Sequence, residues 1–111
     1  YINRGAVNNH LGRYVEGLED LNRGIGIKPG YAEGYFSRGV AYGALGRNRE
    51  AIEDFDRAIR LKPGFAGAYI NRAVVYFNQG DRPSGCRDAK TACGLGGCAF
   101  LEAATNEGLC R

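Results

Sequence analysis

The chain has 111 residues and a net charge of +3, with 44% hydrophobic and 24% charged residues. This length predicts one small domain with a modest core and excludes a deep enclosed active site. Basic residues are spread along the chain beside acidic ones, which is typical of solvated helix faces, so we expect no nucleic-acid partner. No apolar run approaches the roughly 20 residues that span a bilayer, and no signal peptide is visible.

One phrase occurs three times at a fixed spacing. It reads YINRGAVNNHLGR from Tyr1, YFSRGVAYGALGR from Tyr35 and YINRAVVYFNQGD from Tyr69, so the period is 34 residues. Such a period indicates stacked copies of one supersecondary unit. Because Tyr1 falls inside a unit and the chain has no initiator Met, we expect a processed or partial chain.

Each unit contains two helix-period patterns separated by a turn. In the second unit the first helix carries Tyr35, Val40, Tyr42 and Leu45, and Gly46 ends it, since Gly is favoured just past a helix end. Pro63 then stops the second helix. That helix has apolar residues at three- and four-residue spacing: Ala51, Ile52, Phe55, Ala58, Ile59 and Leu61.

Glycine is unusually frequent, with 18 residues. Gly17, Gly24, Gly26, Gly34 and Gly67 fall inside expected helices, where each should cost roughly 1 kcal/mol relative to Ala. Two explanations stay open: packing that demands a tiny side chain, or a reported sequence that under-reads some side chains.

The chain resembles the tetratricopeptide repeat (TPR) family. The second unit matches seven positions of the family pattern: Tyr35, Gly39, Tyr42, Ala51, Phe55, Ala58 and Pro63. The first and third units match more loosely. The resemblance implies an all-α fold, a right-handed superhelical solenoid of three antiparallel helix pairs plus a C-terminal capping helix. We expect a single TPR domain over residues 1–111, with repeats at 1–30 (its first helix truncated), 31–64 and 65–97, and a cap and tail at 98–111.

The resemblance also implies a concave groove lined by the first helices, which holds a peptide or partner segment. Asn3, Ser37 and Asn71 share the position where asparagines of the family form a ladder on the peptide backbone. The alternative is that these are solvated polar residues. The other expected lining residues are Phe36, Val40, Ile70, Val74, Phe77 and Asn78. The two-carboxylate clamp of chaperone-binding repeats needs Lys and Arg where this chain has Glu33, Ser37, Gly67 and Asn71, so a terminal EEVD-type ligand is not expected.

An Arg in the first helix of each unit is followed sixteen residues later by an Asp in the second helix. Because the two helices run antiparallel, we predict an ion pair within each unit. The alternative is a basic stripe that binds an acidic ligand. The pairs are Arg4 with Asp20, Arg38 with Asp54, and Arg72 with Asp88.

Four cysteines, Cys86, Cys93, Cys98 and Cys110, lie in the last quarter of the chain. On one helix Cys86 and Cys93 would be about 10.5 Å apart, too far for a disulfide. If the GLGG turn folds the cap back antiparallel, the pairs are Cys86–Cys110 and Cys93–Cys98. Four reduced thiols in a cytoplasmic protein and a zinc site are the alternatives. The bridges predict the periplasm, cell envelope or exterior, and the tail resembles those of some bacterial TPR proteins.

Nothing in the sequence argues for an enzyme, a cofactor or a metal site. The only histidine, His10, has no Cys or Ser close to it in sequence, and GLGG lacks the context of a phosphate loop. Our first hypothesis is a protein–protein interaction scaffold with a peptide or protein partner. The second is a structural accessory subunit that packs edge-on in a larger assembly or homo-oligomer, because an uncapped first helix exposes apolar surface.

Overall fold

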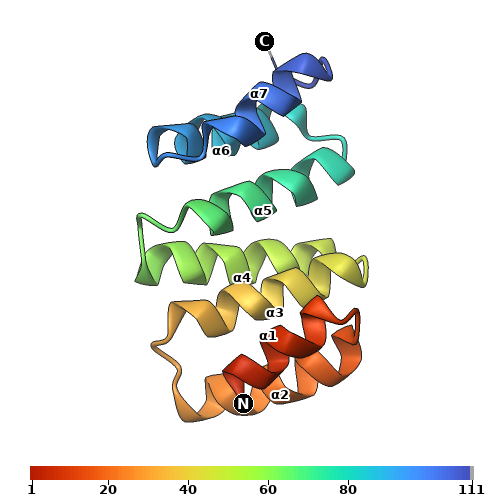
Figure 1. Ribbon diagram of the computed structural model, residues 1–111, viewed down its shortest axis with the longest axis vertical. Helices are drawn as coiled ribbons and strands as arrows, with labels where there is room; N and C mark the ends of the chain where they lie inside the picture. The colour runs from red at the N-terminus through yellow and green to blue at the C-terminus, as the bar shows by residue number, and fades with distance from the viewer. Residues whose placement is uncertain (111) are drawn as a thin grey trace. The chain divides into compact units, whose positions relative to one another are not determined.

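The computed structural model describes residues 1–110, which form seven α-helices and no β-strand (Figure 1). The all-α prediction is confirmed. None of the described helices is long and apolar enough to cross a membrane. The helices are α1 (Ile2–His10), α2 (Tyr14–Ile27), α3 (Ala32–Ala44), α4 (Asn48–Leu61), α5 (Ala66–Asn78), α6 (Arg82–Gly94) and α7 (Cys98–Asn106).

The chain divides into two compact units, Tyr1–Pro63 and Gly64–Arg111. In Tyr1–Pro63, α1 packs against α2 and α3, and α3 also packs against α2 and α4. In Gly64–Arg111, α6 packs against both α5 and α7.

The turn between the two helices of a pair has the same backbone in all three repeats. Gly12, Gly46 and Gly80 occupy one repeat position, and their φ angles are 78°, 79° and 81°. The next residue donates its backbone N–H back to the first helix, as in Arg47 N to Tyr42 O at 2.9 Å. Only Gly takes such a left-handed conformation without strain, so this residue ends the first helix and aims the second one back along it.

Several helix-interior glycines lie where a neighbouring side chain fills the space of a Cβ. A Cβ on Gly24 would lie 2.5 Å from Ile2 Cγ1, and one on Gly85 would lie 2.6 Å from the Phe77 ring. On Gly34 it would lie 3.1 Å from Ile25. Gly26 is different, because no atom lies within 4 Å of its Cβ position. Close helix packing therefore accounts for Gly24, Gly34 and Gly85, and nothing in the structure explains Gly26.

Candidate functional site

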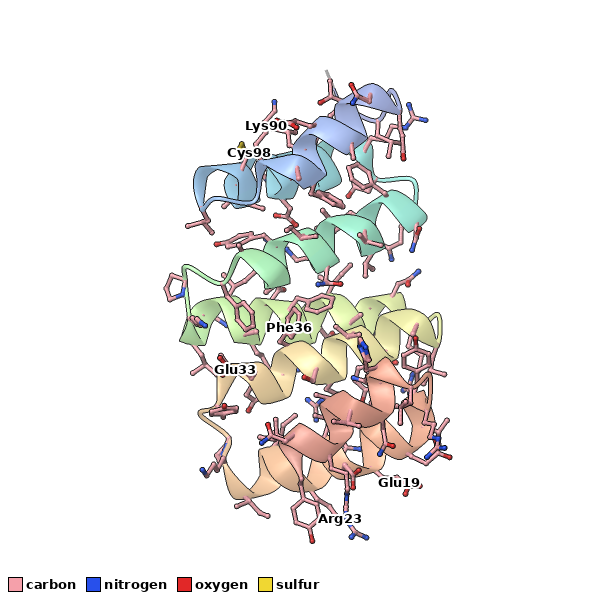
Figure 2. The ribbon with its side chains drawn as sticks, viewed as in Figure 1. Glu19, Arg23, Glu33, Phe36, Lys90 and Cys98 are labelled. Carbon is pink, nitrogen blue, oxygen red and sulfur yellow. A yellow bond between two sulfur atoms is a disulfide. The ribbon has the colours of Figure 1, made fainter. Side chains whose placement is uncertain are left out.

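The expected groove residues lie on the first helix of each repeat, and most of them line one of three separate hollows. Phe36, Ser37 and Val40 on α3 line a hollow of about 360 Å³ that we call the α1–α3 hollow. Ala6, Asn9 and His10 of α1 and Tyr14 of α2 complete its lining. Phe36 projects from α3 and its ring lies 6.0 Å from that of buried Phe55, so the core holds it in place (Figure 2).

The α1–α3 hollow is apolar and aromatic with a few neutral polar groups. None of its described lining residues is Asp, Glu, Lys or Arg. Such a surface favours an uncharged side chain of a partner, since a charge placed there would lose water without gaining a counter-ion. An extended peptide with an apolar anchor fits this chemistry.

Asn9 forms part of the wall of this hollow. Asn9 is only 8% exposed, and its Nδ2 donates to the Ser37 carbonyl oxygen at 2.8 Å. Its Oδ1 is buried without a partner among the described residues, close to where a Cβ of Gly17 would lie. Asn9 thereby joins α1 to α3 over Gly17 of α2.

The three expected ladder residues have different surroundings. Asn3 is exposed, whereas Ser37 is 8% exposed and leaves little surface for a ligand. Asn71 is half-buried, and its Nδ2 donates to the Gly67 carbonyl oxygen of its own helix at 2.8 Å. A peptide that bonded this amide hydrogen would compete with that local bond.

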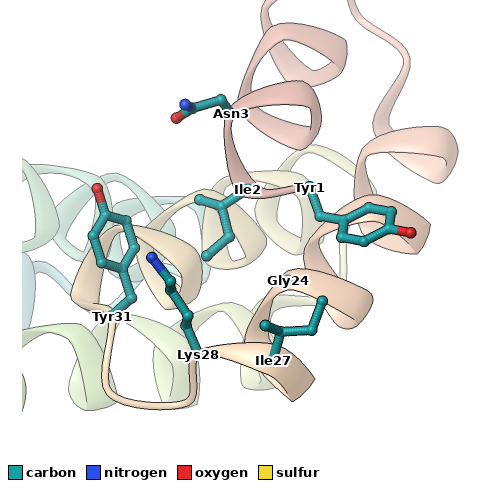
Figure 3. A pocket seen from close by; sticks show the side chains of 7 residues that line it. All are labelled: Tyr1, Ile2, Asn3, Gly24, Ile27, Lys28 and Tyr31. Carbon is teal, nitrogen blue, oxygen red and sulfur yellow. The ribbon is translucent and has the colours of Figure 1, made fainter.

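A second hollow, of about 250 Å³, lies at the start of α1 (Figure 3). Asn3 lines it together with Tyr1, Ile2, Gly24, Ile27, Lys28 and Tyr31. The Lys28 ammonium extends between Ile2 and Tyr31 in this view. The corresponding Lys62, 34 residues later, lies 3.5 Å from Glu33.

A third hollow, of about 190 Å³, lies between α5 and α7 in Gly64–Arg111, and we call it the α5–α7 hollow. The expected residues Val74, Phe77 and Asn78 line its α5 side. The other side comes from α7 and the tail: Phe100, Ala103, Ala104, Glu107 and Leu109. No repeat pattern pointed to these, because α7 lies outside the 34-residue period. Ile70 lies elsewhere, 3.3 Å from the Cβ position of Gly97.

The structure brings each recurrent Arg beside its Asp. Arg38 donates from Nε and Nη2 to the two carboxylate oxygens of Asp54, at 2.7 and 2.8 Å. Arg72 makes the same two-pronged contact with Asp88, at 2.7 Å for both bonds. Paired in this way, with only 18% of the Arg38 side chain exposed, this guanidinium offers little to an acidic ligand.

The first repeat has a weaker version of the same pair. Arg4 donates one bond to Asp20 at 2.6 Å and keeps 63% of its side chain exposed. Asn8 supplies the second bond to Asp20, at 3.0 Å. The hydrogen bond from Arg4 lowers the pKa of Asp20, and partial burial opposes this shift.

The four cysteines lie at disulfide distance in two pairs. Cys86 Sγ and Cys110 Sγ are 2.05 Å apart, and Cys93 is paired with Cys98. The first pair joins α6 to the tail after α7, and the second joins the end of α6 to the start of α7. Within residues 1–110 no three metal-ligating side chains come together.

One repeat of the chain matches a known protein family. Residues 32–65, the second helix pair, match the family model of the tetratricopeptide repeat. This chain contains a tetratricopeptide repeat. No curated protein sequence matches it significantly.

Solved structures share the fold of this chain. A crystal structure of MamA is 28% identical over 82% of the chain, with a TM-score of 0.76. This chain spans about half the length of that protein, 53%. The second TPR of Spaghetti (RPAP3), bound to the HSP90 peptide SRMEEVD, is 26% identical, with a TM-score of 0.79 and coverage of 84% of this chain and 86% of that one. The Sgt2 TPR domain from Aspergillus fumigatus, at 18% identity, has a TM-score of 0.83 and covers 95% of this chain and 74% of its own.

Proposed function

We propose that this protein is an interaction module that holds an extended peptide or partner segment against the first helices of its repeats. The α1–α3 hollow carries this proposal, because it combines a volume of about 360 Å³ with aromatic walls and no Asp, Glu, Lys or Arg in its lining. A partner would insert an apolar side chain there. Within Tyr1–Pro63, a backbone group of the partner would bond the exposed Asn3 amide.

The partner differs from the HSP90 peptide that the RPAP3 structure contains. That peptide ends in the acidic sequence EEVD, and its carboxylates call for a cationic clamp. At the corresponding positions this chain has Glu33, Ser37, Gly67 and Asn71. None of these four residues is Lys or Arg, and Glu33 already holds Lys62 at 3.5 Å, so these positions offer no free cation to an acidic terminus.

Two neighbouring residues on α1 give a matched test. Ala6 lines the α1–α3 hollow, whereas Val7 is 56% exposed and does not line it. Peptides selected from a random phage-displayed library would be titrated against the wild type, Ala6→Glu and Val7→Glu. We expect Ala6→Glu to weaken binding about tenfold by placing a carboxylate at an apolar contact, and Val7→Glu to change it little. Equal affinity of the wild type and Ala6→Glu would overturn the proposal.

A second candidate function is edge-on packing in a larger assembly. Val7 and Leu11, one turn apart on α1, are 56% and 60% exposed. Ala41, the residue 34 positions after Val7, is fully buried on α3, which packs against α2. Val7 on α1 is therefore exposed at a repeat position that is buried on α3. Sedimentation would show self-association that Val7→Glu abolishes and Ala6→Glu preserves; a monomeric wild type would exclude association with itself.

We also propose an oxidising compartment: the periplasm, the cell envelope or the exterior. The two cysteine pairs support this, because disulfides persist where cytoplasmic reductants do not reach. Thiol titration of the protein isolated from its own cells, with alkylation at lysis, tests the proposal. Four free thiols would place the protein in a reducing compartment instead.

A further inference from the structure

We infer that the Cys86–Cys110 disulfide builds a second, redox-controlled peptide subsite, the α5–α7 hollow, which takes an apolar side chain of the partner followed by a basic residue. This inference rests on the proposed peptide-binding function and names part of the partner's chemistry. It has three supports: the walls of the hollow, its single charge, and the way in which the tail is attached.

The walls are apolar and come from two elements. Phe77 on α5 and Phe100 on α7 stack with ring centroids 6.2 Å apart, and Val74 and Leu109 lie at the edge of the hollow. Val74 is 39% exposed, so the surface is open to solvent and to a partner. A volume of about 190 Å³ suits one aliphatic or aromatic side chain.

Glu107 is the only charged residue among those that line this hollow. It forms no ion pair with a described residue, and it is exposed. A carboxylate at the edge of an apolar hollow attracts a cation placed beside the inserted side chain. The partner segment therefore has an apolar residue followed by Lys or Arg.

The wall that Glu107 and Leu109 form depends on the attachment of the tail. Helix α7 has nine residues, and Ala104 is its one buried residue. A helix so short is marginal without help from packing or covalent links. Cys110, 5% exposed, ties the residues after α7 to α6 across a separation of 24 residues. The Cys93–Cys98 pair, with a separation of 5, holds only the turn between the helices.

Reduction would therefore remove the subsite. A dithiol reductant transfers two electrons and two protons to the Cys86–Cys110 bond, which yields two thiols, while the reductant becomes a cyclic disulfide. The tail, with Glu107 and Leu109, then loses its covalent attachment to α6. The α1–α3 hollow contains no cysteine and would keep its shape.

The test uses two blocked tetrapeptides, Ac-Gly-Leu-Arg-Gly-NH₂ and Ac-Gly-Leu-Glu-Gly-NH₂, titrated into the isotope-labelled full chain and followed by amide chemical shifts. We expect the arginine peptide to shift the signals of Val74, Phe100 and Leu109 and to bind about tenfold more tightly there than the glutamate peptide. The double variant Cys86→Ser/Cys110→Ser, or dithiothreitol, should abolish these shifts. The matched control Cys93→Ser/Cys98→Ser should keep them when no reductant is present.

Glu107→Lys provides a second variant that leaves both disulfides intact, and it should reverse the preference between the two peptides. The inference is overturned by equal binding of both peptides, by shifts that persist in Cys86→Ser/Cys110→Ser, or by an equal loss in both cysteine variants. Shifts confined to Ala6, His10 and Phe36 would also overturn it and would leave the proposed function standing. Absence of any shift overturns the subsite, while the library selection with Ala6→Glu decides the function separately.

Discussion

Gly39 of α3 lies directly against the ring of Phe55 on α4: a Cβ on Gly39 would be 2.7 Å from Phe55 Cε1. Phe55 is 1% exposed, so other protein atoms surround its ring. The contact brings the two helices of the second repeat close together. The first repeat has an equivalent contact, where a Cβ on Gly5 would lie 2.5 Å from Leu21 Cγ.

This contact predicts that Gly39→Ala destabilises the protein although Ala favours helices. The extra methyl group must push the Phe55 ring or separate α3 from α4, which should lower the free energy of unfolding by about 1–3 kcal/mol. Urea denaturation followed by circular dichroism measures the change. In the control Gly26→Ala, the Cβ has open space on α2, and the free energy of unfolding should rise by up to about 1 kcal/mol. Equal effects of the two changes would contradict this interpretation.

The Arg–Asp pairs should differ in strength according to their exposure. Asp54 is fully buried and accepts bonds from Arg38, so Arg38→Ala should lower the free energy of unfolding by about 3 kcal/mol, because it leaves a buried carboxylate short of partners. Arg57 retains its contact with Asp54 at 2.8 Å and limits the loss. Arg4→Ala, which removes a largely exposed side chain, should lower the free energy of unfolding far less. Chemical denaturation of both variants measures the two losses of unfolding free energy. A larger loss for Arg4→Ala than for Arg38→Ala would contradict this prediction.

Acid should destabilise the protein through carboxylates with lowered pKa values. The hydrogen bond from Arg4 lowers the pKa of Asp20, and that from Arg47 lowers the pKa of Glu50. Their stabilising contribution is present above the unfolded-state pKa values of about 4 and is lost as the pH falls through the lower folded-state values. Denaturation midpoints measured from pH 6 to pH 2 should fall at the acidic end, and Asp20→Asn should flatten part of that fall. A profile unchanged by Asp20→Asn would contradict the role of Asp20.

The two disulfides should contribute unequally to the stability of Gly64–Arg111. The loop-closure relation gives about 3.5 kcal/mol for the Cys86–Cys110 bridge and about 2 kcal/mol for the Cys93–Cys98 bridge, because the first closes the longer loop. Denaturation of the two double serine variants, without reductant, measures the difference. A greater loss for Cys93→Ser/Cys98→Ser would show that loop length does not govern this part of the chain.

Much of this architecture can be read from the sequence, because a repeat encodes each helix pair locally. The 34-residue period, the Gly that ends each first helix and the helix-period apolar positions depend on residues close along the chain. The ion pair between Arg38 and Asp54 was also predictable. The two residues are sixteen positions apart, and the chain reverses direction between their two helices. These features predicted the helix pairs, and the structure places the Arg and Asp side chains together.

Only the tertiary structure determines which glycines contact a neighbouring helix and which side chains line the same hollow. Gly24 and Gly26 look alike in the sequence, yet only Gly24 faces a neighbouring side chain, Ile2. The sequence predicted Val74 and Phe77 in a binding groove. Phe100, Glu107 and Leu109 line the same hollow because α7 and its tail fold against the last repeat. The sequence determined the helix pairs through local periodicity and turn chemistry. Which side chains share a hollow depends on contacts between residues distant in the chain, and those exist only in the packed protein.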